Sequence, residues 1–188
     1  MSEFEYADDV SASDDGSGPP PSHIRDQERF TEALPLCVLP TLVRQHLGRV
    51  VLVPYAATML LPGLETASAM AVPDATWQGW EWPNGDSVLL GAHRNPELPR
   101  LRALHPVPGE CRVEIAGRPM AIALSQVDVP IGTRHVAHVN GFLDDATSFF
   151  ACIVSRTSES RDALLAALST LEPEKPAGVE QPPAPGGC

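Results

Sequence analysis

The sequence predicts an α+β fold in which a mainly antiparallel sheet is packed by helices, with a C-terminal amphipathic helix on the sheet. Three observations predict this fold. Residues 149–154 form an unbroken apolar run, and a strand that is apolar on both faces is typical of the centre of a sheet. Leucines on one helical face follow that run at positions 164, 165, 168 and 171, before Pro173. The remaining predicted strands are short and are joined by hairpins, which favours an antiparallel sheet.

The N-terminal half is predicted to contain two helical pieces followed by two strands: residues 24–33, 36–47, 49–61 and 66–72. Ser22 is a candidate N-cap for the first helix, because its hydroxyl can accept a hydrogen bond from an unpaired backbone N–H. Pro40 interrupts the second helical piece. Pro54 indicates that the strand at residues 49–61 is an edge strand or contains a bulge.

The C-terminal half is predicted to form strands that turn back on one another: residues 87–93, 112–116, 120–127 and 134–139. Gly117 and Arg118 predict the turn between the second and third of these strands. The connection to the apolar run turns either at Asn140–Gly141 or at Asp144–Asp145, and the aspartates are favoured. The segments between predicted strands are residues 73–85, a loop or hairpin, and the irregular residues 95–108.

Composition divides the chain into one domain and two tails. The formal net charge is −11, and residues 1–22 contain six acidic residues but no lysine or arginine. These residues and the Pro- and Gly-rich residues 173–188 bury too little apolar surface to offset the entropy of ordering, so both tails are predicted to be disordered. A single α+β domain is expected at residues 23–172. Because this domain is mildly acidic, no nucleic-acid partner is predicted.

The cysteines and the N-terminus predict a cytoplasmic protein without a membrane partner. The four cysteines are widely spaced and form no CxxC pair, so reduced thiols are expected, with neither a disulfide framework nor a zinc knuckle. They are Cys37, Cys111, Cys152 and Cys188. The N-terminus carries acidic residues where a signal peptide has basic ones. No glycine-rich nucleotide motif is present, and no cofactor is predicted.

Three segments of the chain carry a resemblance to a known family. They are AMAVPDATWQGWEWPNGDSVLLGAHR, RVEIAGRPMAIAL and GFLDDATSFFACIVSRTSESRDALLAALSTLE, and they span roughly residues 66–171. An apolar strand with Pro and Trp, a hairpin with an A-G-x-P turn, and a strand leading into a terminal helix resemble the Mog1/PsbP-like family, which includes actinobacterial LpqN-type proteins. The resemblance implies an antiparallel sheet between helices and a binding or adaptor role.

All three tryptophans of the chain fall within residues 77–82, and two of them, Trp80 and Trp82, would share one face of an extended segment. Clustered indoles suit a protein interface, although they also serve to cover one end of a core. The arginines that follow could hold an acidic partner or could lie in a solvated loop. The predicted partner-binding residues are Trp77, Trp80, Trp82, Arg94, Arg100 and Arg102. The sequence thus predicts a non-catalytic, chaperone-like binding or adaptor protein whose partner is another protein.

Two alternative functions stay open. His135 or His138 with an aspartate could serve a small hydrolase or transferase. In a strand, residues i and i+3 point to opposite faces, so these two histidines do not suit one metal ion and no metal site is predicted. The other alternative is a structural subunit of a larger assembly, and a homo-oligomer is left open with it.

Overall fold

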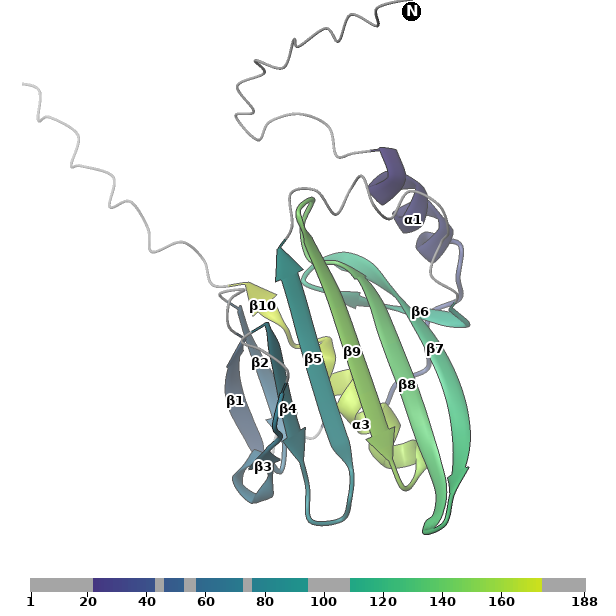
Figure 1. The fold of residues 1–188 in the computed structure, drawn as a ribbon. Helices are drawn as coiled ribbons and strands as arrows, with labels where there is room; N and C mark the ends of the chain where they lie inside the picture. The colour runs from purple at the N-terminus through teal and green to yellow at the C-terminus, as the bar shows by residue number, and fades with distance from the viewer. Residues whose placement is uncertain (1–21, 43–45, 53–56, 73–75, 95–108, 174–188) are drawn as a thin grey trace, which may run out of the picture.

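The structure is a computed structural model that describes residues 22–42, 46–52, 57–72, 76–94 and 109–173. The helical elements are α1 (Ser22–Glu32), the 3₁₀ helix η1 (Leu64–Thr66) and α3 (Ser158–Leu168). The strands are β1 (Leu47–Leu52), β2 (Ala57–Pro62), β3 (Ser68–Ala69), β4 (Trp77–Glu81), β5 (Ser87–Arg94), β6 (Cys111–Ile115), β7 (Arg118–Val129), β8 (Gly132–Phe142), β9 (Thr147–Ser155) and β10 (Glu172–Pro173). They form two sheets (Figure 1).

The larger sheet has seven strands in the order β3–β4–β5–β9–β8–β7–β6, and every neighbouring pair is antiparallel. Strand β9 lies between β5 and β8 in the middle of this sheet, which confirms the prediction that residues 149–154 form a central strand. The smaller sheet has the order β1–β2–β10 and is also antiparallel. The predicted fold class, α+β with a mainly antiparallel sheet, is confirmed.

One cluster of buried apolar side chains joins both sheets and α3. In β9, alternate residues are buried, and Phe149 and Ile153 belong to the cluster. Met59 of β2 and Leu168 of α3 belong to the same cluster and are almost fully buried. Removing one such side chain from water contributes about 1.5–3 kcal/mol to stability. We call the side of the seven-stranded sheet that carries this cluster the inner face, and the opposite side the outer face.

Helix α3 begins directly after β9 because Thr157 caps it. The Thr157 hydroxyl accepts a hydrogen bond from the backbone N–H of Ser160 at 3.1 Å. Glu159 lies in the first turn, and hydrogen bonds from its own backbone N–H and from the Thr157 side chain lower the pKa of its carboxyl. Strands β2, β8 and β9 contact this helix, which Figure 1 shows behind the larger sheet.

Arg118, the first residue of β7, ties α1 to the sheet. Its guanidinium donates to Glu28 of α1 at 2.9 Å and to Asp145, in the turn between β8 and β9, at 2.6 Å. Burial lowers the pKa of Arg118, but hydrogen bonds and the charges of the two carboxylates outweigh burial and raise it. The prediction that the chain turns at Asp144–Asp145 is confirmed, because β8 ends at Phe142 and β9 begins at Thr147.

The predicted helical piece at residues 36–47 is wrong for its described parts, residues 36–42 and 46–47, which contain no helix. Leu36 is bridged in parallel to Arg112 of β6, and the backbone N–H of Cys37 donates to the Arg112 carbonyl at 2.9 Å. The side chain of Arg112 also donates to the backbone carbonyl of Leu34, just before this segment, at 3.2 Å. Pairing with β6 therefore outweighs the apolar spacing that predicted a helix.

The expectation of reduced thiols is wrong at two positions, because Cys37 and Cys111 form a disulfide across a sequence separation of 74 residues. Spacing along a sequence does not reveal which cysteines will meet, and this pair meets only because the segment around Cys37 runs beside β6. Closing a loop of this length stabilises the fold by about 4 kcal/mol, chiefly by restricting the unfolded chain. Cys152 is the free cysteine among the described residues.

The predicted strand at residues 49–61 is instead two strands, β1 and β2, which pair with each other from Leu47↔Pro62 to Leu52↔Ala57. Pro54 falls between them, outside the described residues. The strand expected at residues 66–72 is shorter, since β3 contains only Ser68 and Ala69. Strand β10, which pairs with β2 after α3, was not predicted.

The ends of the chain are described only in part. Of the two predicted tails, the structure describes only Ser22, which begins α1, and Pro173, which ends β10. Within the described residues, no helix is long and apolar enough to cross a lipid bilayer.

Candidate functional site

Strand β4 separates the tryptophans onto two faces of the sheet. Residues 73–85 were predicted to form a loop or a hairpin, and the hairpin agrees with the structure: β4 pairs with β5 along its length, with Trp77 opposite Gly91. Trp80 and Trp82 pack on the inner face, in or against the core. Trp77 is three residues before Trp80, and because side chains alternate along a strand, it points to the outer face. There its side chain is half-buried. The three indoles therefore do not form one contact surface.

Trp82 is a structural residue. Its side chain is only 8% exposed, and its indole Nε1 donates to the carbonyls of Pro62 at 3.1 Å and Gly63 at 3.0 Å. These hydrogen bonds satisfy the polar end of a buried indole and connect the end of β4 to the end of β2. The interpretation of the tryptophans as a cover for the core is thus correct for Trp82.

An aromatic row crosses the outer face from β4 to β8 and consists of Trp77, Phe150 and His138. The ring centroids of Trp77 and Phe150 are 5.6 Å apart, and the ring planes meet at 71°. The His138 and Phe150 rings are stacked, with centroids 6.1 Å apart and planes at 29°. Aromatic pairs of this kind are worth about 0.5–1.5 kcal/mol beyond their burial. We call these three side chains the outer aromatic row, and each of them is half-buried.

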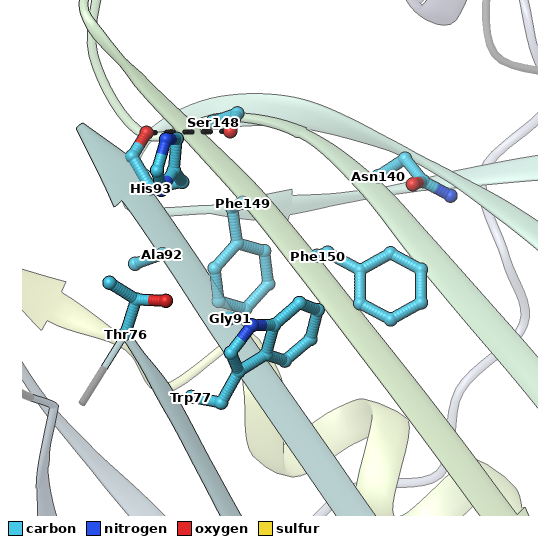
Figure 2. Close-up of a pocket in the computed structure, with 9 residues that line it drawn as sticks. All are labelled: Thr76, Trp77, Gly91, Ala92, His93, Asn140, Ser148, Phe149 and Phe150. Carbon is cyan, nitrogen blue, oxygen red and sulfur yellow. Dashed lines mark hydrogen bonds between the residues drawn. The ribbon is translucent and has the colours of Figure 1, made fainter. Parts of the chain in front are cut away.

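Gly91 gives the Trp77 ring its place in the outer aromatic row. A Cβ atom at position 91 would lie 2.7 Å from a carbon of the Trp77 indole, which is closer than real Cβ contacts. The indole therefore lies over the Gly91 backbone, between its own strand and Phe150 (Figure 2). An aromatic ring that covers a glycine on the neighbouring strand also helps to fix the register of the two strands.

A cavity of about 270 Å³ opens beside the outer aromatic row, where β5 ends and β9 begins (Figure 2). Its apolar lining consists of Trp77, Gly91, Ala92, Phe149 and Phe150. Its polar lining consists of Thr76, His93, Asn140 and Ser148. The Ser148 hydroxyl donates to the His93 carbonyl at 3.4 Å. The site thus offers an apolar recess with several hydrogen-bonding groups around it.

The predicted arginines are only partly placed by the structure. Arg94 is the last residue of β5 and follows His93, a residue of the cavity, although its side chain is not described. Arg100 and Arg102 lie outside the described residues. Contact of the three arginines with a partner therefore stays a prediction. Of the three, only Arg94 has a described backbone, and it lies next to the cavity.

The two histidines of the enzyme alternative lie on opposite faces of β8. His138 is opposite Cys152 on the outer face, whereas His135 is opposite Ser155 on the inner face, with its Nδ1 3.4 Å from Nε2 of Gln126. The Ser155 hydroxyl is buried and has no hydrogen-bond partner among the described residues, so it forms no nucleophile–base pair with His135. Nor do the described residues contain a group of three His, Cys, Asp or Glu side chains that could hold a metal ion.

Phe150 and Gly91 are central to this site but were not predicted as site residues. Phe150 was interpreted only as part of an apolar strand, and Gly91 only as a strand residue. Strand alternation is the signal that could have found Phe150. Trp80 and Phe149 face the core, so Trp77 and Phe150, an odd number of residues away from them, must face the other side of the sheet. Which outer-face residues meet depends on the register between β4, β5 and β9, and that register comes from the fold.

Cys152 lies on the outer face of β9, two residues after Phe150, and is half-buried. Burial raises the pKa of its thiol above the ordinary cysteine value. The thiol is therefore protonated at neutral pH and is available as a probe of this face, which is used below.

Comparisons with known proteins add little to this geometry. No family model matches the sequence, and no curated protein matches it. A solved crystal structure from Bacteroides thetaiotaomicron VPI-5482, determined at 1.50 Å resolution, is similar with a TM-score of 0.47 and 12% sequence identity. The match covers 68% of this chain and 49% of that chain, so this chain matches about half the length of the solved one.

Proposed function

We propose that this protein is a non-catalytic binding or adaptor protein that holds another protein through the outer aromatic row and the cavity beside it. The observation that carries the proposal is the half-buried pair of Trp77 and Phe150 on the outer face. Exposed aromatic rings with few rotatable bonds are the side chains that most often dominate protein interfaces. Of the two long helices described, α3 packs mainly against β2, β8 and β9, and α1 packs mainly against β6, β7 and β8, whereas Trp77 lies on β4.

The cavity is large enough for one side chain of a partner protein. Its volume of about 270 Å³ is close to the lower limit of the roughly 300–1,000 Å³ that is usual for small-molecule sites. The apolar lining from Trp77 and Phe150 fits an aromatic or aliphatic side chain. The polar side chains of His93 and Asn140 can bond the backbone beside that side chain, which would fix its orientation.

The architecture expected from the sequence is part of this proposal. The amphipathic helix α3 serves as the cover of the inner face and leaves the outer face for the partner, as in the antiparallel sheet that the Mog1/PsbP-like resemblance implies. A cytoplasmic location also stays a sequence-based prediction. The Cys37–Cys111 disulfide weighs against it, because stable disulfides are rare in reducing compartments.

The proposal can be tested without knowing the natural partner. Peptides would be selected from a random displayed library on the immobilised full chain, and the tightest peptide would be synthesised and titrated by calorimetry. We expect selected peptides to share an aromatic or aliphatic anchor. Trp77→Ala and Phe150→Ala should each weaken binding by about tenfold or more, as is usual for central aromatic residues of an interface.

Val51→Ala provides the matched control, because Val51 is a large apolar residue, 49% exposed, on β1 of the smaller sheet. This variant should bind the peptide as the wild type does. Wild-type affinity in folded Trp77→Ala and Phe150→Ala variants would refute the proposed surface, and so would a selection that yields no binding peptide.

A further inference from the structure

Strand β7 has an open edge along residues 123–129. On one side, β6 pairs with β7 only as far as Ile122, while on the other side β8 pairs with β7 as far as Val129. Among the residues that the structure describes, no strand pairs with β7 beyond Ile122 on the β6 side, and Figure 1 shows this part of β7 at the border of the sheet. We call residues 123–129 the open edge.

Alternate residues of the open edge point their backbone groups away from β8. The carbonyl of Ile122 accepts from the backbone N–H of Glu110 at 2.8 Å, so the Ile122 backbone points to the β6 side. Backbone groups alternate in direction along a strand, and therefore those of Leu124, Gln126 and Asp128 point to the same side. An unpaired row of N–H and C=O groups is a template for another strand.

The other two borders of this sheet are protected, which sets the open edge apart. Strand β3 at one border has two residues, and β6 at the other is bridged by the chain at Leu36. Short edge strands, covering segments and edge charges are the usual means by which proteins prevent unwanted strand pairing. Within the described ranges no segment covers the open edge; it contains no lysine, and its Val127 side chain is 47% exposed.

We propose that the open edge pairs in antiparallel fashion with the open edge of a second copy of this chain, across a two-fold axis at Gln126. The register centred on Gln126 pairs all of residues 123–129 with the same residues of the second copy. A register centred elsewhere gives a shorter ladder, because β6 already occupies the edge at Ile122. Closed two-fold dimers are the commonest protein oligomers, and continuous sheets across them satisfy edge backbone groups.

The side chains of the open edge are complementary to themselves in this register. The two Gln126 side chains face each other, and a carboxamide is both a donor and an acceptor. Asp128 lies opposite Leu124 of the second copy, so the two aspartates, the only charges of the open edge, do not oppose each other. Val127 lies opposite Ser125 of the second copy, which would cover part of its exposed surface.

Light scattering after size exclusion of the full chain, over a concentration series, tests the dimer. The wild type should approach twice the chain mass of 20.1 kDa as concentration rises. Gln126→Pro removes an N–H that points away from β8, so it leaves the β7–β8 ladder intact but breaks the proposed pairing at its centre. The dimer dissociation constant should then rise by about tenfold to a hundredfold, because two hydrogen bonds are lost.

Gln126→Glu tests the register with a nearly isosteric change, since it places two carboxylates opposite each other only if the two-fold axis lies at position 126. It should weaken the dimer by about threefold, and added salt should relieve the weakening. Gln126→Thr, which keeps the backbone and adds no charge, is the matched control and should dimerise. A wild type that stays monomeric, or a dimer that both Gln126→Pro and Gln126→Glu leave unchanged, would overturn the proposal.

Discussion

The two faces of strand β9 carry neighbouring phenylalanines with opposite surroundings. Phe149 is 2% exposed and belongs to the core cluster on the inner face. Phe150 is half-buried on the outer face, where it contacts Trp77 and His138. The same residue type thus stabilises the fold in one position and forms a surface in the next. The difference comes from what covers each face, since the smaller sheet and α3 share the inner cluster.

Strand β4 and Trp82, the residue that follows it, repeat the same contrast with tryptophans. Trp82 donates hydrogen bonds inside the structure, whereas Trp77 lies over Gly91 at the rim of the cavity. The comparison of both strands teaches that residue type alone does not distinguish core from contact surface in this chain. The face of the strand on which a residue lies, and the elements that cover that face, distinguish the two. Matched substitutions on the two faces can test this.

The phenylalanine pair should give the largest difference in stability. Phe149→Ala leaves a cavity in the core cluster and should lower the free energy of unfolding by about 3–5 kcal/mol. Phe150→Ala loses mainly its aromatic contacts on the outer face and should cost only about 1 kcal/mol. Urea unfolding of both variants measures the difference. Equal losses in the two variants would contradict the assignment of an inner and an outer face.

The tryptophan pair should give a smaller difference. Trp82→Phe removes the indole N–H that donates to the Pro62 and Gly63 carbonyls, at a cost of about 1–3 kcal/mol; Gly63 keeps its hydrogen bonds from Thr66. Trp77→Phe keeps a ring over Gly91 and should change stability by no more than about 0.5 kcal/mol. Thermal unfolding followed by circular dichroism checks both values. A larger loss for Trp77→Phe than for Trp82→Phe would reverse the comparison.

Much of the sheet could be predicted because its strands are marked by local patterns. The apolar run at residues 149–154 predicted a central strand covered on both sides; β9 is central, but the core cluster covers its inner face, whereas Phe150 on the outer face is only half-buried. The hairpin of β6 and β7 followed from alternation around a glycine-containing turn. These features depend on residues that are close in the sequence, which is why sequence reasoning reached them.

The errors lie where distant segments meet. The chain at residues 36–42 is extended because it is bridged to Arg112 and crosslinked to Cys111, and neither partner is visible from the spacing of its leucines. Likewise, the candidate site needed the register of β4 against β5, which places Trp77 on Gly91. Proline and glycine around the tryptophans left a loop or a hairpin open, and the pairing of β4 with β5 agrees with the hairpin.

The smallest effect we predict concerns Cys152, which reports on the partial burial of the outer face. In a Cys188→Ser background, Cys152 is the one remaining thiol, since Cys37 and Cys111 are joined. Burial raises the pKa of this thiol, so its thiolate fraction at neutral pH is below that of an ordinary cysteine. Alkylation by iodoacetamide should therefore be slower than in the urea-unfolded chain at the same pH. The rate should rise as the pH is raised beyond about 8.5, the ordinary cysteine value.

Phe150→Ala sharpens this measurement, because it uncovers Cys152 from the same face of the same strand. With less burial the pKa of the thiol should fall toward its ordinary value, and alkylation at neutral pH should become severalfold faster. Phe149→Val is the control on the inner face, and in folded protein it should leave the rate unchanged because Phe149 and Cys152 point to opposite sides of β9. If Phe149→Val accelerated alkylation as much as Phe150→Ala, the thiol would be responding to general loosening of the fold and not to its own face of the sheet.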